Sequence, residues 1–458
     1  MGKTNKGYAQ FIENKSQFGP LHGFDDIEFP EFLFDFQKTL VEWSIRKGRS
    51  AIFADCGLGK TPMQLAWAEA IQKKTNKPVL ILTPLAVSHQ TVAEGEKFGI
   101  EVKRSTNGIH DKGITVTNYE RLHYFNPDDF SGVVCDESSI LKSFDGVRKE
   151  SITDFMRKVP YRLLCTATAA PNDYIELGTS SEALGELGYI DMLNQFFIND
   201  QGTTNPNKIW DGAGWRFKHH GEQHFWRWVS SWARAIRKPS DLGFSDDSFD
   251  LPPLNVDQSV IPALMVKPGM LFDVPAVGLQ EEREVRRRTI NERCELAASK
   301  VKDTNEPAVM WCHLNDEGDL LENLVPGSVQ VSGSDSDDEK ESKFQSFQNG
   351  DIRVLITKPK IGAFGLNWQH CAHLTYFPSH SYEQYYQAVR RCWRFGQDKP
   401  VTVDLVSTDG DERVVANLQR KTEAADVMFA DLVRHMGNEL TVQRSREYPG
   451  EVEIPSWL

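Results

Sequence analysis

Short apolar runs alternate with amphipathic stretches along most of the chain, which is the pattern of buried strands covered by helices. The stretches between the runs are long enough for helical crossovers, so neighbouring strands can run parallel. The alternation occurs in each half of the chain, and two α/β domains are its simplest account. In the first half the predicted strands are residues 50–54, 79–82, 114–116, 133–135 and 163–165. In the second half they are residues 309–311, 329–331, 354–356, 374–377 and 401–405.

The stretch between these halves breaks the alternation. Residues 195–250 are rich in aromatic, glycine and basic residues, and Leu251-Pro252-Pro253 follows them directly. We interpret this stretch as a short helical insertion with an aromatic and basic composition. The first domain is therefore expected at residues 1–250, with the insertion at about 195–250, and the second domain at residues 251–458.

Three smaller patterns predict helices. Trp228 and Trp232 are four residues apart, so they would share one helix face, and their burial against the first domain is favoured. Residues 281–301 predict one long charged helix. The acidic run at residues 334–341 indicates a solvated helix start capped by Ser and Asp, in preference to a metal site.

Composition narrows the class of protein. Charged residues make up 26% of the 458 positions, a share that is typical of soluble globular proteins. No apolar run approaches the ~18 residues needed to cross a bilayer, and the first residues lack the apolar core of a signal peptide. The seven cysteines are scattered without a C-x-x-C pair, so reduced thiols fit better than disulfides or a zinc site. We expect a soluble cytoplasmic protein with no membrane partner.

The net charge of −13 argues against a basic surface over the whole molecule. A local basic segment remains, because seven Lys or Arg residues oppose two acids between Lys208 and Lys238, a balance of +5 (7 − 2). This segment is expected to present a positive face to phosphates. The side chains expected to form that face are Arg216, Lys218, Arg227, Arg234 and Arg237.

The loop after the first predicted strand has the sequence Ala54-Asp55-Cys56-Gly57-Leu58-Gly59-Lys60-Thr61, and a helical pattern follows it. This strand–loop–helix context is that of a phosphate-binding loop, in which glycines let backbone N–H groups face phosphate oxygens. Lys60 can reach the β- and γ-phosphates, and the Thr61 hydroxyl can hold Mg²⁺. The strict pattern begins with Gly where this chain has Ala54, and a glycine-rich turn before a core helix is the alternative. The expected nucleotide contacts are Gly57, Leu58, Gly59, Lys60 and Thr61.

Two acidic residues, Asp136 and Glu137, end the predicted strand at 133–135. A carboxylate in this place can hold Mg²⁺, and the following Glu can orient or deprotonate an attacking water. We therefore expect Thr61 and Asp136 at a metal ion and Glu137 at the water. A later loop, Thr166-Ala167-Thr168, carries hydroxyl groups suited to sensing a γ-phosphate.

Gln387, Arg391 and Arg394 recur at spacings of four and seven residues, which predicts that they share one helix face. Planar guanidinium groups suit bidentate contact with phosphate. With a phosphate loop in the first half of the chain, these arginines indicate a catalytic arginine offered across a cleft by the second domain.

In this order the segments resemble the motifs of superfamily 2 helicases, and among them the Swi/Snf-like double-stranded DNA translocases. The phosphate loop resembles motif I, Asp136-Glu137-Ser138-Ser139 resembles motif II, and Thr166-Ala167-Thr168 resembles motif III. Residues 387–397, which end in Arg-x-Gly-Gln, resemble motif VI. The similarity covers roughly residues 30–430.

The resemblance also implies roles that the patterns alone do not. Gln37 occupies the place of the glutamine that recognises adenine, and Gly365 belongs to a segment similar to motif V that contacts nucleotide, as Gln387 does in motif VI. Motifs Ia, Ib and V carry nucleic-acid contacts in the family. The residues of this chain that match them are Pro84, Thr117, Asn118, Thr357 and Lys358.

The family's fold is a pair of RecA-like P-loop domains, each a mostly parallel sheet flanked by helices, and here the insertion would lie between motifs III and IV. The resemblance implies that ATP and Mg²⁺ are the cofactors and that ATP hydrolysis drives translocation, or protein remodelling, on double-stranded DNA. Ser139 replaces a commoner His, Gln90 a usual Trp, and motif V has two extra residues before Gly362. Because Ser139 stands in the fourth position of motif II, the resemblance does not assign to this chain the coupling contacts that this position makes in the family.

The helical insertions of large chromatin remodellers are short or missing in this chain. A compact motor of the bacterial or phage type is therefore expected, in the cytoplasm of a bacterium or a phage-infected cell. Its protein partners would belong to a replication, repair or recombination machinery.

Two other functions fit parts of the pattern. One is a strand-separating RNA or DNA helicase, against which the Arg-x-Gly-Gln ending of motif VI argues. The other is a catalytically weak scaffold that binds nucleic acid, which the presence of Lys60, Glu137 and Arg394 disfavours. Stimulation of ATP hydrolysis by duplex DNA or by RNA would distinguish among these functions.

Overall fold

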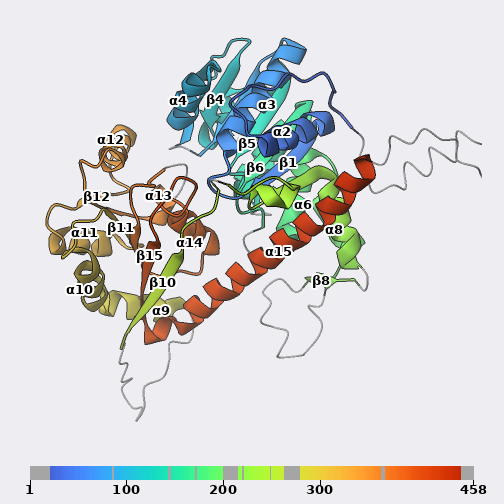
Figure 1. Ribbon diagram of the computed structural model, residues 1–458. Helices are drawn as coiled ribbons and strands as arrows, with labels where there is room; N and C mark the ends of the chain where they lie inside the picture. The colour runs from blue at the N-terminus through green and yellow to red at the C-terminus, as the bar shows by residue number, and fades with distance from the viewer. Residues whose placement is uncertain are drawn as a thin grey trace, which may run out of the picture.

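The computed structural model describes residues 21–84, 87–142, 146–170, 173–199, 215–218, 221–247, 249–262, 279–362 and 367–444. Two larger sheets, each covered by helices, form the two halves of the molecule, and all of their described strand pairings are parallel (Figure 1). The expected architecture of two parallel α/β domains is thereby confirmed.

The first sheet contains every strand predicted in the first half of the chain, because these apolar runs are buried on both faces. Its order is β3-β4-β2-β5-β6-β1-β9. Parallel pairing places the carboxyl ends of β1 and β5, which carry the phosphate loop and the two acids, at the same edge. The strands are β1 (Arg49–Ala54), β2 (Val79–Thr83), β3 (Val102–Arg104), β4 (Ile114–Asn118), β5 (Gly132–Asp136), β6 (Tyr161–Thr166) and β9 (Ala233–Ile236).

The predicted helical insertion is in part an element of this sheet. β9 pairs with β1 in parallel, from Ala51 opposite Ala233 to Ala54 opposite Ile236. Its small apolar side chains are buried, so the segment can lie between β1 and the covering helices. A second departure from the helical prediction is an antiparallel pair, β7 (Phe197–Asn199) and β8 (Trp215–Phe217).

The second sheet has the order β10-β15-β14-β11-β13-β12, and it confirms the strands predicted in the second half. β10 was not predicted, because polar residues alternate along it, yet it pairs with β15 over its whole length. The strands are β10 (Leu254–Ile261), β11 (Ala308–Trp311), β12 (Val329–Val331), β13 (Val354–Thr357), β14 (His373–Tyr376) and β15 (Val401–Thr408).

Helices cover both sheets and follow the amphipathic stretches. In the first half they are α2 (Asp35–Lys47), α3 (Lys60–Thr75), α4 (Ser88–Phe98), α5 (Val147–Lys158), α6 (Leu177–Leu184), α7 (Tyr189–Phe196) and α8 (Gly221–Trp232). In the second half they are α9 (Leu279–Arg288), α10 (Ile290–Val301), α11 (Asn315–Leu324), α12 (Asp337–Gln348), α13 (Pro359–Gly362), α14 (Tyr382–Val389) and α15 (Glu412–Arg444). Short 3₁₀ turns are η2 (Tyr119–Tyr124), η3 (Pro127–Asp129), η4 (Ser138–Lys142), η5 (Tyr174–Glu176), η7 (Pro239–Leu242) and η8 (Asp409–Asp411).

Two of the smaller helix predictions are confirmed and one is wrong in detail. The three indoles of α8 are buried in the first core, and the Ser336 hydroxyl caps α12 by accepting from the Glu339 amide at 3.3 Å. The charged stretch at 281–301 is two helices, because the chain leaves the helical conformation at Thr289. The Thr289 hydroxyl is buried and donates to the carbonyl of Val285 at 2.8 Å.

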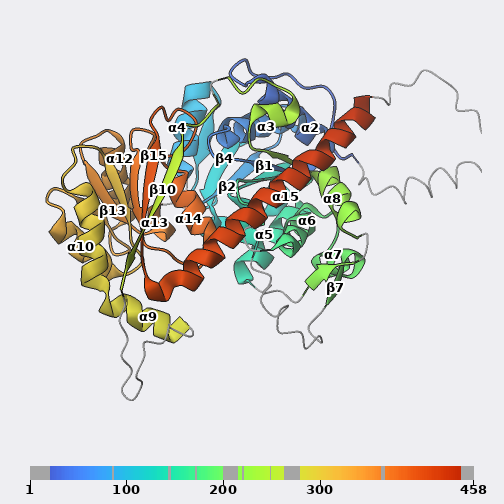
Figure 2. The ribbon, with the colours of Figure 1, turned by 60° about the horizontal axis from the view of Figure 1, so that its bottom comes forward.

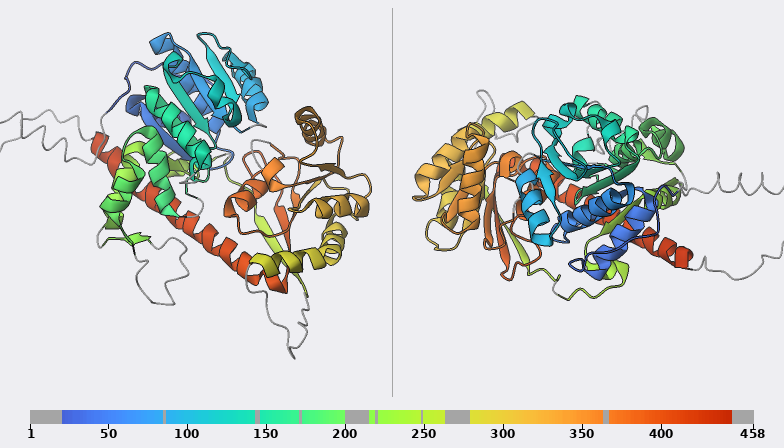
Figure 3. Two further views of the ribbon diagram at one scale, coloured as in Figure 1. Left: turned by 180° about the vertical axis from the view of Figure 1, so that it is seen from behind. Right: turned by 90° about the horizontal axis from the view of Figure 1, so that it is seen from above.

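α15 connects the two halves of the molecule. It begins directly after the second sheet and crosses to the first, where it lies along α8 and β9 (Figures 1, 2 and 3). Met428, Phe429, Leu432 and Met436 belong to the same buried cluster as Trp232. The end of the chain therefore completes the core of the first half.

All seven cysteines are buried free thiols, as their spacing predicts. Among the described residues, no helix combines the length and the apolar character that a membrane span requires.

Replacing Leu432 by Ala should lower the free energy of unfolding of the first half of the molecule by about 2–5 kcal/mol, because it leaves a cavity in that core. Leu432 is fully buried there, whereas Val427 on the same helix is 53% exposed. Urea unfolding followed by tryptophan fluorescence measures the difference, with Val427→Ala as the matched control. Equal effects of the two substitutions would show that α15 does not complete this core.

Candidate nucleotide site between the two sheets

The loop between β1 and α3 has the backbone of a phosphate-binding loop. Gly57 and Gly59 lie in the left-handed region, with φ angles of +90° and +74°. A Cβ on Gly59 would lie 2.3 Å from Nε2 of Gln37, and one on Gly57 would lie 2.6 Å from the amide nitrogen of Phe395. Both positions favour glycine for their backbone conformation, and at Gly57 the backbone of Phe395 also leaves no space for a Cβ.

Gln37 lies against this loop, as the resemblance implies. Its Nε2 donates to the carbonyl oxygen of Leu58 at 2.9 Å, and its Oε1 accepts from the amide of Phe34 at 3.0 Å. Both ends of the side-chain amide are therefore fixed at the start of α2 and on the loop. Gly365, the other nucleotide contact predicted outside motifs I and VI, lies outside the described residues.

The acidic pair at the end of β5 is buried beside the phosphate loop. Nε2 of Gln64, in the first turns of α3, donates to Asp136 Oδ1 at 2.7 Å. Burial and the adjacent Glu137 carboxylate raise the pKa of Asp136 to about 7, while Gln64 and Lys60 act in the opposite direction. The Thr166 hydroxyl donates to Glu137 Oε2 at 3.3 Å, so the loop predicted to sense phosphate contacts the predicted water-activating carboxylate.

The residues predicted to hold a metal ion fit a cation that is shared with a nucleotide. No group of three or more His, Cys, Asp or Glu side chains that could bind a metal occurs in the part of the chain that the structure describes. Mg²⁺ suits such a place, because it is usually held by one or two carboxylates together with substrate phosphates. Asp136 and Glu137 are both buried, so a cation beside them would relieve their mutual repulsion. Thr61 lies in the first turn of α3, where the helix begins.

The prediction that the motif VI arginines lie on one helix face is wrong. α14 ends at Val389, and Arg391 and Arg394 follow in turns. Tertiary hydrogen bonds take the carbonyl groups that would continue the helix. The Arg391 carbonyl accepts from the Trp368 amide at 2.9 Å, and that of Cys392 accepts from the Gln397 side chain at 3.2 Å.

These arginines nevertheless meet the phosphate loop. Arg391 Nη2 donates to Oε1 of Gln387 at 2.8 Å, and the Cys56 thiol approaches the same oxygen at 3.9 Å. The backbone of Phe395 lies against Gly57. Motif VI of the second half and motif I of the first half are therefore in direct contact.

Arg394 lies within electrostatic reach of the acidic pair. Burial and the nearby Arg391 guanidinium lower the pKa of Arg394 to about 10, and Glu137 is among the groups that act in the opposite direction. The structure therefore brings the predicted catalytic residues of both halves to one cleft.

Comparison with known proteins supports this assignment. Residues 294–396, which include β11 to β14 and α14, match the family described as "Helicase conserved C-terminal domain". Over 171 residues the chain is 28% identical to the mouse "DNA annealing helicase and endonuclease ZRANB3", a match that covers 33% of this chain and 16% of that protein. The chain thus contains a helicase C-terminal domain and is similar over a third of its length to a DNA helicase.

Other relatives match shorter segments of this chain. The chain is 37% identical over 94 residues to the "Bifunctional helicase and thymine dioxygenase JBP2" of Leishmania tarentolae, which is 20% of this chain and 9% of that protein. The chain thus spans a small part of the length of these curated relatives. A solved structure, "Sulfolobus solfataricus SWI2/SNF2 ATPase core in complex with dsDNA", aligns over 90% of this chain and 96% of that chain at 15% identity. The TM-score of this alignment is 0.41.

The nucleic-acid contacts predicted for this chain lie at the carboxyl ends of β2, β4 and β13. Pro84 and Lys358 are half-buried. The side chains of Thr117, Asn118 and Thr357 are buried, and the two threonine hydroxyls donate to carbonyl groups of the protein. Thr117 and Thr357 therefore brace the strand ends, and contact of these residues with nucleic acid stays a prediction.

The predicted basic face of the insertion is smaller than expected. Arg216 on β8 and Arg227 on α8 are exposed, and Lys218 is half-buried with its ammonium group donating to the carbonyl of Asn194. The β7–β8 pair lies beside α7 and near α8, away from the second sheet (Figure 1).

The other two arginines predicted for that face are corrected. Arg234 is buried, with its guanidinium 4.1 Å from the centre of the Trp43 ring. Arg237 is paired with Asp426 of α15 at 2.7 Å. Both side chains join elements of the protein.

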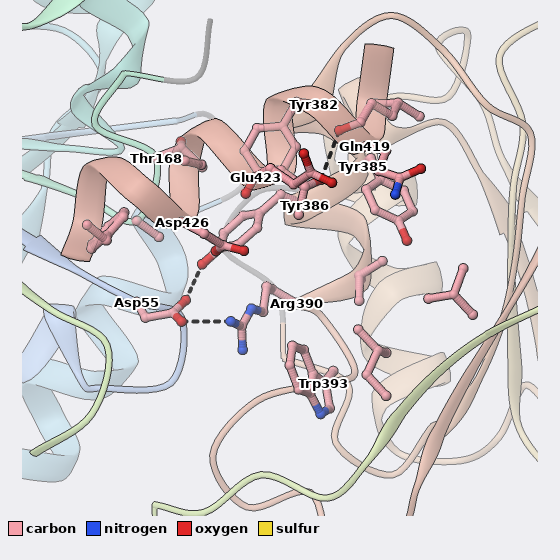
Figure 4. Close-up of a pocket in the computed structure, with 18 of the residues that line it drawn as sticks. Asp55, Thr168, Tyr382, Tyr385, Tyr386, Arg390, Trp393, Gln419, Glu423 and Asp426 are labelled. Atoms are coloured by element: carbon pink, nitrogen blue, oxygen red, sulfur yellow. Dashed lines mark hydrogen bonds and ion pairs between the residues drawn. The ribbon is translucent and has the colours of Figure 1, made fainter. Parts of the chain in front are cut away.

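The sequence patterns missed two sets of residues at this site. Gln64 orients Asp136, and its place three residues after Thr61 was the available signal. Asp55 of the phosphate loop binds Tyr386 of α14 and Arg390 of motif VI, at 2.7 Å in the case of Arg390 (Figure 4). Asp55 and Arg390 were both visible in the sequence, but no sequence pattern indicated that the two side chains form a pair.

Substituting Gly59 by Ala should abolish nucleotide binding, because the new methyl group would displace the Gln37 amide from the phosphate loop. Gly99 is the matched control. Its φ angle is +72°, and nothing lies within 4 Å of a Cβ built there. Gly99→Ala should therefore carry only the backbone strain of about 1–2 kcal/mol. Thermal unfolding and titration with a fluorescent ATP analogue separate strain from steric clash, and normal binding by Gly59→Ala would contradict this account of the loop.

Proposed function

We propose that this protein hydrolyses ATP with Mg²⁺ to translocate on double-stranded DNA. The observation that carries the proposal is the direct contact between the phosphate loop of one half and the arginine-bearing loop of the other, at Gly57 with Phe395 and at Cys56 with Gln387. A site divided in this way responds to nucleotide by closing, and it opens when the γ-phosphate is lost.

The chemistry follows from the residues that meet in the cleft. Lys60 balances charge on the β- and γ-phosphates, and its Nζ is held at the loop by the Ala54 carbonyl at 3.0 Å. Glu137 orients and deprotonates the attacking water, and Arg394 stabilises charge in the transition state. A Mg²⁺ ion held by Thr61 and Asp136 would supply further charge neutralisation on the phosphates.

Two observations support duplex DNA as the track. Motif VI ends in Arg-x-Gly-Gln, which is typical of Swi/Snf-like proteins, and the mouse relative is named for annealing DNA. We also propose that the protein is a compact motor of the bacterial or phage type. It would act in the cytoplasm together with a replication, repair or recombination machinery. Gln37 is proposed to recognise adenine.

The test is ATP hydrolysis by the full chain with duplex DNA, single-stranded DNA or RNA in parallel. Duplex DNA should stimulate the rate most, and the protein should displace a triplex-forming strand without separating the duplex. Preferential stimulation by RNA would support a strand-separating RNA helicase instead. Binding without hydrolysis in all three cases would support the scaffold.

Glu137→Gln should leave nucleotide binding intact and reduce ATP turnover by about 100-fold or more, because an amide is a poor general base. Glu96→Gln is the matched control, since Glu96 is exposed on α4 and far from the acidic pair in the chain. Phosphate release and binding of a fluorescent ATP analogue measure the two quantities. Turnover at the wild-type rate in Glu137→Gln would refute the role of this carboxylate.

Neutralising Arg216 and Lys218 together, as Gln, should weaken duplex binding. Each lost phosphate contact should reduce the slope of log affinity against log salt by ~0.9. Arg287→Gln with Lys302→Gln removes the same charge from exposed positions of the second half and is the matched control. If both pairs leave the slope unchanged, the DNA track lies elsewhere than the insertion.

A further inference from the structure

The carboxylate of Asp55 joins the phosphate loop to α14 and the turn after it (Figure 4). Its Oδ2 lies 2.7 Å from Arg390 Nη2, and its Oδ1 accepts from the Tyr386 hydroxyl. The same Oδ1 accepts from the Cys56 amide at 2.6 Å, which fixes the carboxylate on its own loop. Asp55 and Arg390 are both largely buried.

The Arg390 guanidinium is held by aromatic rings as well as by charge. It lies 4.2 Å from the centre of the Trp393 ring and 5.2 Å from that of Tyr386. Burial alone would lower its pKa, but the Asp55 carboxylate and Tyr386 outweigh burial and the pKa lies above its ordinary value. Arg390 is therefore a fixed, fully charged group.

A second ionic contact lies at the other end of α14. Lys142, which ends the 3₁₀ turn after motif II, is paired with Glu383 in the first turn of α14. Glu383 is buried and Lys142 is half-buried. Each charge on α14 also suits its place on the helix, because an acid is favoured at the N-terminus and a base at the C-terminus.

The two contacts together form a charge clamp, which consists of Asp55, Tyr386 and Arg390 at one end and Lys142 and Glu383 at the other. The acid Glu383 lies in the first turn of α14, and the base Arg390 directly follows its last residue. The first half places the opposite charges against them, Lys142 against Glu383 and Asp55 against Arg390. Complementary charges in this order fix the direction in which α14 can dock, because a reversed helix would place like charges together.

Neither contact uses a residue assigned to phosphate, metal or water. Asp55 directly precedes the turn that contains Gly57, and Arg390 directly precedes Arg391. The clamp thus joins the beginning of the phosphate loop to the beginning of the arginine loop, which consists of the turns after α14 that contain Arg391 and Arg394. A displacement of Arg390 would be passed to Arg391 and Arg394 over a few residues of backbone.

We propose that the charge clamp is a positioning device that seats the arginine loop against the phosphate loop, so that Arg394 can act on the nucleotide. This inference rests on the proposed ATP hydrolysis. It assigns Asp55, Tyr386, Arg390, Lys142 and Glu383 as positioning residues, because they act through Arg391 and Arg394.

A double-mutant cycle tests the first contact. Arg390→Gln should lower the kcat for ATP by about 30-fold or more, because it removes the charged partner that ties the chain beside Arg391 to the Asp55 carboxylate. KM should change by less than about threefold, since the lost contact serves the transition state. Asp55→Asn should behave similarly, and the double variant should lose no more than the worse single variant, because the amides can still hydrogen-bond. Arg287→Gln, at an exposed position, is the matched loss of charge and should be neutral.

Charge reversal tests the second contact without altering the phosphate loop. Lys142→Glu and Glu383→Lys should each reduce kcat, and combining them should restore at least about half of the loss on a logarithmic scale, because the pair is re-formed in reverse. Tyr386→Phe, which removes only a hydroxyl, should have the smallest effect. Thermal unfolding of each variant identifies one that fails to fold.

Hydrogen exchange of the full chain provides a readout that does not depend on turnover. Arg390→Gln should speed exchange at residues 386–395 and at the phosphate loop, and Arg287→Gln should not. Wild-type kcat in Arg390→Gln, losses that multiply in the double variant, or unchanged exchange would each overturn the clamp. A wild-type protein that fails to hydrolyse ATP would refute the proposed function, and the exchange result would still decide whether the clamp seats the loop.

Discussion

Like charges are crowded on each side of the cleft, and opposite charges face one another across it. Asp136 and Glu137 are adjacent and buried at the end of β5, so the pKa of Asp136 is raised, while Arg394 is buried beside Arg391 and its pKa is lowered. Burial and an adjacent like charge therefore both disfavour the charged form of Asp136 and of Arg394. Glu137 of the first half and Arg394 of the second half attract one another. A nucleotide with its cation would add a negative group next to the arginines and a positive one next to the carboxylates.

The architecture keeps these two sides available to one another. Parallel sheets present the carboxyl ends of their strands at one edge, and the phosphate loop and acidic pair share that edge in the first half. α15 then returns from the second sheet and inserts four apolar side chains into the core of the first. The two halves are thus connected by a packed helix in addition to the chain between β9 and β10. The pair between Arg237 and Asp426 lies at the same junction.

The site was predicted well where one segment carries all the information and poorly where two segments share it. The phosphate loop needs Gly57 and Gly59 for its backbone, so it was visible in the sequence before any fold was known. The burial of Arg234 over Trp43 was not visible, because a lone arginine in a basic segment carries no mark of its ring partner. The role of Gln64 was not visible either, because its partner Asp136 follows only after three further strands of the chain.

The sequence by itself determined the two parallel sheets, the phosphate loop, the acidic pair and the identity of the motif VI arginines, because each depends on local periodicity or on closely spaced residues. The tertiary structure alone decided that α14 ends before Arg391, since the Trp368 amide and the Gln397 side chain take the following carbonyl groups. It also decided that Asp55 meets Arg390 and that α15 completes the first core. These features join residues far apart in the chain, and such pairings become readable only when the fold brings both partners together.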